Sequence, residues 1–205
     1  MLNDVKRQLE AKGYTLQAQL NHVEIAEFIR PYFFRKNPVM LFYAFFNVVL
    51  LGFIIFHVII SEHTMNSILL IISGIFLFAV VVPIHELIHG LFYRLAGAKN
   101  VSYKAVWRKF IFYAMADGFV TSKIPFLILA MAPFVIINSI LIAWLFFVPE
   151  ASISILYGLL FMHTAGCSGD FALLSYFYSF WEKDPLTFDD VEAGVSYFYI
   201  KYNSK

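Results

Sequence analysis

Charged residues are scarce in this chain of 205 residues, because Asp, Glu, Lys and Arg make up only 14% of it. Soluble domains contain about 25% charged and about 45–50% apolar residues. Here 60% of the residues are hydrophobic, and the mean hydropathy is +0.73. This composition excludes a water-soluble globular domain, and it excludes a disordered chain, which requires low hydrophobicity. A multispanning membrane protein is the class that remains.

Cysteine and excess charge of either sign are also nearly absent. Cys167 is the single cysteine, so no internal disulfide can form. The formal net charge is only +1, whereas a surface that binds nucleic acid normally needs clustered bases. We therefore expect no nucleic-acid partner.

Four segments are long and apolar enough to cross a membrane, since about 20 residues are needed for about 30 Å of hydrocarbon. They are residues 39–60, 67–95, 124–148 and 152–181. Helices are the default for such segments because they satisfy every backbone polar group internally. The predicted fold class is therefore an all-α membrane protein with four transmembrane helices.

The distribution of bases predicts the orientation. All 15 Lys and Arg residues lie before the first span, after the fourth, or between the second and third, where Arg94 is counted at the inner end of the second. Under the positive-inside rule, both termini and the loop at 96–123 are then cytoplasmic. We expect an integral membrane protein with a cytoplasmic N-terminal region at 1–38, a membrane domain at 39–181 and a cytoplasmic tail at 182–205. No cleaved signal peptide is expected, because the N-terminal region lacks an apolar core.

The regions at both chain ends predict short helices. Residues 2–12 and 21–30 have amphipathic patterns, and Arg30-Pro31 is expected to end the second helix. The tail has a helix start signal at Thr187, followed by two acids in the first turn. We therefore predict a further short helix over 187–199.

The loop at 96–123 has a different character. Residues 101–107 and 110–115 are rich in β-branched and aromatic residues, and a turn signal follows at Asp117-Gly118. This pattern favours a small cytoplasmic β-hairpin or sheet. An interfacial aromatic loop is the alternative.

The most informative motif is His85-Glu86-Leu87-Ile88-His89. Residues four apart share one face of a helix, so both imidazoles can bind one metal ion. Neutral imidazoles are good ligands for Zn²⁺, and the ion lowers the pKa of a bound water. A neighbouring carboxylate can then act as general base and later return the proton to the leaving amine. The motif predicts a zinc-dependent peptidase with Glu86 as its catalytic base.

Asp170 is the predicted third metal ligand. Within the four predicted spans, Glu86 and Asp170 are the only acids, and intramembrane acids normally mark functional sites. Counted from the outer ends of their spans, at residues 67 and 152, the two acids lie at nearly equal depth, about 27 Å at 1.5 Å per residue. A catalytic zinc usually takes three protein ligands. A structural ion pair between Asp170 and Arg94 is the alternative.

Other polar residues in the spans are candidates for supporting the ligands or for contacting the substrate. His163 and Cys167 share a helix face with Asp170, but His163 lies about 10 Å from Asp170 along the axis. One zinc ion would bind both only if the helix bends, so whether Asp170 or His163 is the third ligand stays open. Cys167 can also be a simple buried apolar residue, and Asn138 can simply hold helices together. The small residues at 164–169 are expected to let another helix approach closely.

Residues 85–89 and a membrane-embedded Gly169-Asp170 resemble the "Putative zincin peptidase" family of bacterial membrane proteins and, more distantly, the site-2 protease group of intramembrane metalloproteases. The resemblance covers about residues 20–200. It implies that both histidines and Asp170 bind zinc, that Glu86 is the base, and that the protein lies in a bacterial cell membrane. In site-2 proteases the third ligand commonly lies in an Asn-Pro-x-Asp-Gly or Leu-Asp-Gly context, whereas Asp170 follows Cys-Ser-Gly. No substrate rule is therefore carried over.

The sequence thus predicts a zinc metallopeptidase that hydrolyses a membrane protein or peptide near the cytoplasmic leaflet. The scissile segment must be extended, and the strands within 101–120 could receive it by edge pairing. A non-catalytic scaffold or chaperone with a residual metal site is one alternative, which the intact Glu86 disfavours. A metal transporter or sensor is another, but the outer halves of the spans offer almost no ligands. The oligomeric state stays open.

Overall fold

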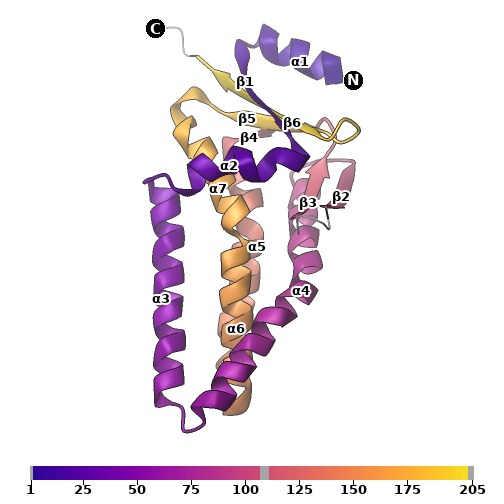
Figure 1. The fold of residues 1–205 in the computed structure, drawn as a ribbon. Coiled ribbons are helices and arrows are strands. Elements are labelled where there is room, and N and C mark those ends of the chain that lie inside the picture. The colour runs from indigo at the N-terminus through magenta and orange to yellow at the C-terminus, as the bar shows by residue number, and fades with distance from the viewer. Residues whose placement is uncertain (1, 107–110, 203–205) are drawn as a thin grey trace.

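The structure, a computed structural model, describes residues 2–106 and 111–202 and combines long helices with two small antiparallel sheets (Figure 1). The helices, including two short 3-10 turns labelled η, are α1 Leu2–Ala11, η1 His22–Glu24, α2 Ile25–Phe33, α3 Pro38–Ile60, α4 Thr64–Leu95, α5 Lys123–Trp144, α6 Glu150–Gly166, α7 Ser168–Ser179 and η3 Trp181–Lys183. The strands are β1 Tyr14–Asn21, β2 Val101–Val106, β3 Ile111–Ala116, β4 Thr121–Ser122, β5 Leu186–Asp190 and β6 Val195–Lys201.

Three helices among the described residues, α3, α4 and α5, are long and apolar enough to cross a membrane. They correspond to the first three predicted spans. In the most apolar windows of α3 and α4, only 22% and 11% of the residues are buried within the protein. Apolar surface on this scale is not tolerated in water by a soluble monomer, which indicates a membrane protein.

The prediction of an all-α fold with four transmembrane helices is wrong, and residues 152–181 are one reason. This segment forms α6, with 17 residues, and α7, with 12 residues, which meet at Cys167. The junction lies among glycine and serine residues of low helix propensity, and the ψ angle of Cys167 is 1°. Figure 1 shows the two helices running in succession back to the end of the molecule where the sheets lie.

A four-stranded antiparallel sheet, in the order β1-β6-β5-β4, is the other reason. The edge strand β1 pairs with β6 from Tyr14 opposite Lys201 to Asn21 opposite Val195. Neither β1 nor β6 was predicted. The helices expected at 2–12 and 21–30 correspond to α1 and to η1 with α2, and Pro31 lies inside α2 rather than ending it.

The helix predicted over 187–199 is also wrong, because this segment forms the hairpin of β5 and β6. Of the two acids that followed the predicted helix start, Asp190 instead ends β5 and stabilises the turn after it. There the carboxylate of Asp190 accepts a hydrogen bond from the backbone N–H of Ala193, 2.9 Å away. Gly194 closes the turn with a φ of +69°, a conformation that favours glycine. The aromatic and β-branched residues of β6 then favour a strand.

The hairpin predicted within the loop at 96–123 is confirmed. β2 and β3 pair antiparallel from Val101 opposite Ala116 to Val106 opposite Ile111. Residues 107–110 of the predicted strands lie outside the described residues. Asp117-Gly118 follows β3, and the N–H of Gly118 donates to the carbonyl of Asp189 at 2.8 Å. This turn therefore joins the small sheet to the larger one.

Two glycines allow α4 and α6 to cross closely. A Cβ atom on Gly74 would overlap the carbonyl oxygen of Ile155, and one on Gly158 would overlap the carbonyl oxygen of Ile71. Within the run at 164–169, Gly166 is also closely approached by α4, since an added Cβ would overlap the ring of Phe78. The contacts between the two backbones lie farther toward the start of α6. The crossing holds the second half of α6 beside α4.

An aromatic core fixes α7 beneath the larger sheet. Phe126 of α5 stacks on Phe177 of α7 with the ring centroids 3.8 Å apart, and Phe198 of β6 packs against both. Since α7 also carries Asp170, this packing determines which way the carboxylate can face.

Candidate metal centre

His85 and His89 lie one turn apart on α4 and are both buried. Their Nε2 atoms are 3.1 Å apart. Asp170, in the first turn of α7, faces both rings: its Oδ2 lies 3.2 Å from Nε2 of His85, and its Oδ1 lies 3.3 Å from Nε2 of His89. The structure thus brings together the three residues that the sequence suggested as ligands.

The hydrogen bonds of His89 show that this group fits a cation. Nδ1 of His89 lies 3.0 Å from the backbone carbonyl of Leu129. A carbonyl only accepts, so Nδ1 carries the proton, and in a neutral ring Nε2 is then a bare acceptor. The lone pair of this nitrogen therefore faces the negative carboxylate of Asp170. Such an arrangement is stable only with a positive charge between the two groups, which a proton or a metal ion can supply.

The spacing of the donor atoms agrees with a zinc ion. Four ligands at about 2.0–2.1 Å in a tetrahedron lie about 3.3 Å from one another. The two Nε2 atoms lie 3.1 Å apart, and the nearer carboxylate oxygen of Asp170 lies 3.2 Å from His85 and 3.3 Å from His89. Two imidazoles and one carboxylate are also a known donor set for catalytic zinc, with the fourth position left open. The residues present therefore fit the ion.

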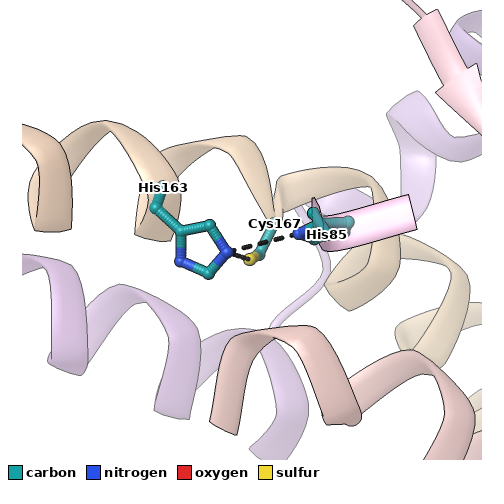
Figure 2. A group of neighbouring side chains, drawn as sticks. All are labelled: His85, His163 and Cys167. Atoms are coloured by element: carbon teal, nitrogen blue, oxygen red, sulfur yellow. Dashed lines mark hydrogen bonds between the residues drawn. The ribbon is translucent and has the colours of Figure 1, made fainter. Parts of the chain in front are cut away.

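His163 lies on the opposite edge of the His85 ring. Its Nε2 atom is 3.3 Å from Nδ1 of His85, and its Nδ1 atom is 2.7 Å from Oδ1 of Asn138. Figure 2 shows His163 of α6 reaching toward His85 of α4, with Cys167 beside it. The Sγ atom of Cys167 is 3.9 Å from Nε2 of His163. His163 and Asp170 thus approach different nitrogens of His85.

The carboxylate of Glu86 lies beside a strand. Glu86 follows His85 on α4, and the backbone N–H of Ala114 in β3 lies close enough to its carboxylate to stabilise the negative charge. Its Oε2 atom is buried and has no hydrogen-bond partner among the described residues. A buried carboxylate oxygen without a partner is costly, so this atom is available for chemistry. The hairpin that the sequence predicted therefore contributes directly to the site.

Two cavities meet at Glu86. One, of about 310 Å³, extends past His89 and Asp170 toward Ile29 of α2 and Tyr93 of α4. The other, of about 520 Å³, is mostly apolar and is lined by Phe78, Ala79, Val82, Pro83 and Met162. Phe112 of β3 and Gly166 of α6 border both. An extended peptide could therefore run from one cavity to the other past the carboxylate of Glu86.

A second polar group, which sequence reasoning missed, lies in the larger sheet. Nε2 of His22 is 2.9 Å from Oγ of Ser196, and this hydroxyl donates to Oδ1 of Asp189 at 2.6 Å. Burial lowers the pKa of His22 to about 4 and raises the pKa of Asp189 to about 6, because it disfavours both charged forms. A small cavity beside this group shares Tyr93 and Tyr113 with the cavity of about 310 Å³.

The alternative pairing of Asp170 with Arg94 is not what the described residues show, since the recorded ion-pair partners of Asp170 are the two histidines. Asn138 contacts His163 and therefore lies beside the site rather than apart from it. Sequence reasoning could place Glu86 and Asp170 at similar depth. It gave no signal for Leu129 or Ala114, because both contribute backbone atoms.

The fold and site define a membrane-type helical protein with a buried group of metal-ligand character. The family described as "Putative zincin peptidase" matches residues 78–183, and the chain belongs to this family. The family indicates a metallopeptidase, and the matched segment includes both histidines of the motif, Glu86 and Asp170. No match was found among curated proteins or among solved structures.

Proposed function

We propose that the protein is a zinc-dependent membrane peptidase in which His85, His89 and Asp170 bind zinc and Glu86 is the general base. One observation carries the proposal: the Nε2 atoms of His85 and His89 lie 3.1 Å apart, and each lies 3.2–3.3 Å from a carboxylate oxygen of Asp170, separations that suit tetrahedral coordination. Membership of a metallopeptidase family supports it.

The chain's own groups can perform the proton transfers of peptide hydrolysis. When bound, zinc lowers the pKa of a water molecule and polarises the substrate carbonyl. Oε2 of Glu86 accepts a proton from the attacking water, because it has no other partner among the described residues. The same atom then donates that proton to the amide nitrogen as the C–N bond breaks. We propose that the nearby backbone N–H of Ala114 helps to orient the carboxylate during both transfers.

The two cavities support a peptide substrate that is extended at the scissile bond. The apolar cavity suits the side chains of a segment that lies within or beside a membrane span. Because β3 borders both cavities, we propose that the substrate lies along this strand. The hairpin of β2 and β3 would then serve as substrate guide as well as holding Glu86.

We further propose that the sheet end of the molecule faces the cytoplasm of a bacterial cell. The bases of the chain support this orientation, since the connections at 61–66 and 149–151 hold none. Figure 1 shows that α1, β6 and the hairpin of β2 and β3 all lie at this one end.

The decisive experiment compares the full chain with Glu86→Gln. Both proteins are purified from membranes in detergent for metal analysis, and membrane proteomes are compared in cells that express one or the other. We expect one zinc ion per chain in both, and fragments of membrane proteins only with the wild type. The amide introduced by this substitution fills the same space as the carboxylate but cannot accept the proton.

Two results would overturn the proposal. A wild-type protein that binds no zinc would remove the metal site. Zinc binding without any fragments that depend on Glu86 would instead favour the scaffold or chaperone with a residual metal site.

A further inference from the structure

We propose that His163 is a positioning residue that holds the ring of His85 with its Nε2 lone pair directed at the metal. This inference rests on the proposed function, because it assumes that Nε2 of His85 is a zinc ligand. It assigns a role to a buried histidine of α6 that does not itself touch the ion.

A chain of hydrogen bonds crosses three helices and ends at His85. The amide nitrogen of Asn138, on α5, donates to Oγ1 of Thr164 at 3.1 Å. Oδ1 of Asn138 is 2.7 Å from Nδ1 of His163, and Nε2 of His163 is 3.3 Å from Nδ1 of His85. His163 and Thr164 are fully buried, and Asn138 is 2% exposed. Polar groups this deep must be paired.

The direction of these bonds determines the tautomer of His85. Oδ1 of Asn138 can only accept, so Nδ1 of His163 carries a proton and its Nε2 is an acceptor. Nδ1 of His85 must then donate to it, which leaves Nε2 of His85 without a proton and able to bind metal. If every bond ran the other way, Nε2 of His85 would carry the proton and could not be a ligand. The order that follows from the orientation of the Asn138 amide is therefore the one that zinc requires.

The other histidine ligand shows the same principle with a simpler partner. Nδ1 of His89 donates to the backbone carbonyl of Leu129, which is always an acceptor. No equivalent carbonyl is recorded at Nδ1 of His85 among the described residues, where the partner is His163. The imidazole of His163 can either donate or accept a hydrogen bond, so its partner Asn138 determines that its Nε2 accepts from His85. Such outer partners of metal ligands fix ring orientation and raise ligand basicity.

Direct metal binding by His163 is the competing interpretation. His85, His163 and Cys167 offer ligand atoms within 4.8 Å of one another, and Figure 2 shows them together. The separation of 3.9 Å between Sγ of Cys167 and Nε2 of His163 exceeds the about 3.5 Å expected for tetrahedral zinc. Nε2 of His163 also cannot bind a metal while its lone pair accepts a hydrogen bond from Nδ1 of His85. We therefore favour the positioning role.

The test measures zinc affinity of the full chain in detergent by competition with a chelator. His163→Leu removes the acceptor for His85, and we expect zinc affinity to fall about 10- to 100-fold. His163→Gln should recover most of the loss, because its amide can accept from His85 and donate to Asn138. Cys167→Ala is the matched control, and it should keep both the affinity and one zinc ion per chain.

The visible absorption of bound Co²⁺ gives a readout that a loss of packing alone would not imitate. We expect the ligand-field bands to change in His163→Leu and to return in His163→Gln. If His163→Leu does not stay monodisperse, Asn138→Leu replaces it, because this variant keeps both imidazoles and should weaken zinc binding in the same direction.

Unchanged zinc affinity in His163→Leu would overturn the positioning role while leaving the proposed function intact. Two zinc ions in the wild type, of which Cys167→Ala loses one, would also overturn it, because His163 would then be a ligand. Failure of the wild type to bind zinc would instead reject the proposed function itself.

Discussion

At the scale of single residues, Asp170 supplies the negative charge that faces both histidines. Replacing it with asparagine keeps the size of the side chain but removes the charge that balances a divalent cation. Loss of a supporting hydrogen bond typically lowers metal affinity about 10- to 100-fold, and we expect Asp170→Asn to lower it further. Chelator competition on the purified protein measures this.

Asp184→Asn is the matched control for Asp170→Asn. Asp184 pairs with Tyr14 and Lys123 and lies outside the metal centre, so its loss should leave zinc affinity unchanged. An equal fall in both variants would show that Asp170 acts through general stability and is not a ligand.

The two buried groups His22 and Asp189 are expected to make the stability of the fold depend on pH in opposite directions. The pKa of Asp189 is raised to about 6 by burial, so its contribution to stability is complete below pH 4 and is lost as the pH rises through 6. The pKa of His22 is lowered to about 4 by burial, so its contribution is complete above pH 6.5 and is lost as the pH falls through 4. The two effects oppose each other in the wild type.

Single substitutions should separate these two contributions. Between pH 6.5 and 4, Asp189→Asn should lose thermal stability relative to wild type as the pH falls, because the His22 contribution is no longer offset. His22→Gln should gain stability relative to wild type over the same change. Melting temperatures of the three proteins in one detergent, at several pH values, check this. The prediction would be contradicted if the melting temperature of both variants, relative to wild type, changed in the same direction as the pH falls.

How far the site follows from the sequence depends on which atoms form it. The spacing of His85 and His89 is local to one helix, and Asp170 could be placed by depth because helical rise is regular. The contacts of Ala114 and Leu129 could not be anticipated. Both are made by backbone atoms, and their positions depend on how β3 and α5 pack against α4.

At the scale of elements, the crossing of α4 and α6 places His163 beside His85. Gly158 lies against the backbone of α4, where an added Cβ would overlap the carbonyl of Ile71. We expect Gly158→Ala to push the helices apart, lower thermal stability and weaken zinc binding. Unfolding and zinc titration in detergent would show both effects.

Gly52→Ala is a suitable control for Gly158→Ala, because a Cβ at Gly52 in α3 meets nothing within 4 Å. This change should leave stability and zinc binding near wild type, or raise stability slightly through better helix propensity. If Gly158→Ala behaved in the same way, close packing at this crossing would not be what positions the site.

The strands show where sequence patterns are insufficient at this scale. β2 and β3 are neighbours in the chain, and their β-branched and aromatic residues predicted the hairpin. β1 and β6 are separated by almost the whole chain, so their pairing has no local signal. The acids near Asp190 resemble a helix start, yet the same carboxylate chemistry also stabilises a turn. Only the fold determines which is formed.

At the scale of the whole molecule, the two sheets and the metal centre lie toward the same end of the helices. The turn at Gly118 joins the small sheet to the larger one, and Ala114 of the small sheet lies beside Glu86. The orientation of the sheet end therefore also decides on which side of the membrane the metal centre lies.

Thiol labelling can determine that orientation, because the single native cysteine, Cys167, is fully buried and gives little background. Gln17 is exposed on β1 at the sheet end, and Glu62 is exposed in the connection between α3 and α4. In intact cells, a membrane-impermeant maleimide should label Glu62→Cys but label Gln17→Cys only after the membrane is opened. The positive-inside rule requires this result, since the connection at 61–66 holds no base. Equal labelling of Gln17→Cys in intact cells would place the sheets and the peptidase site on the outer side of the membrane.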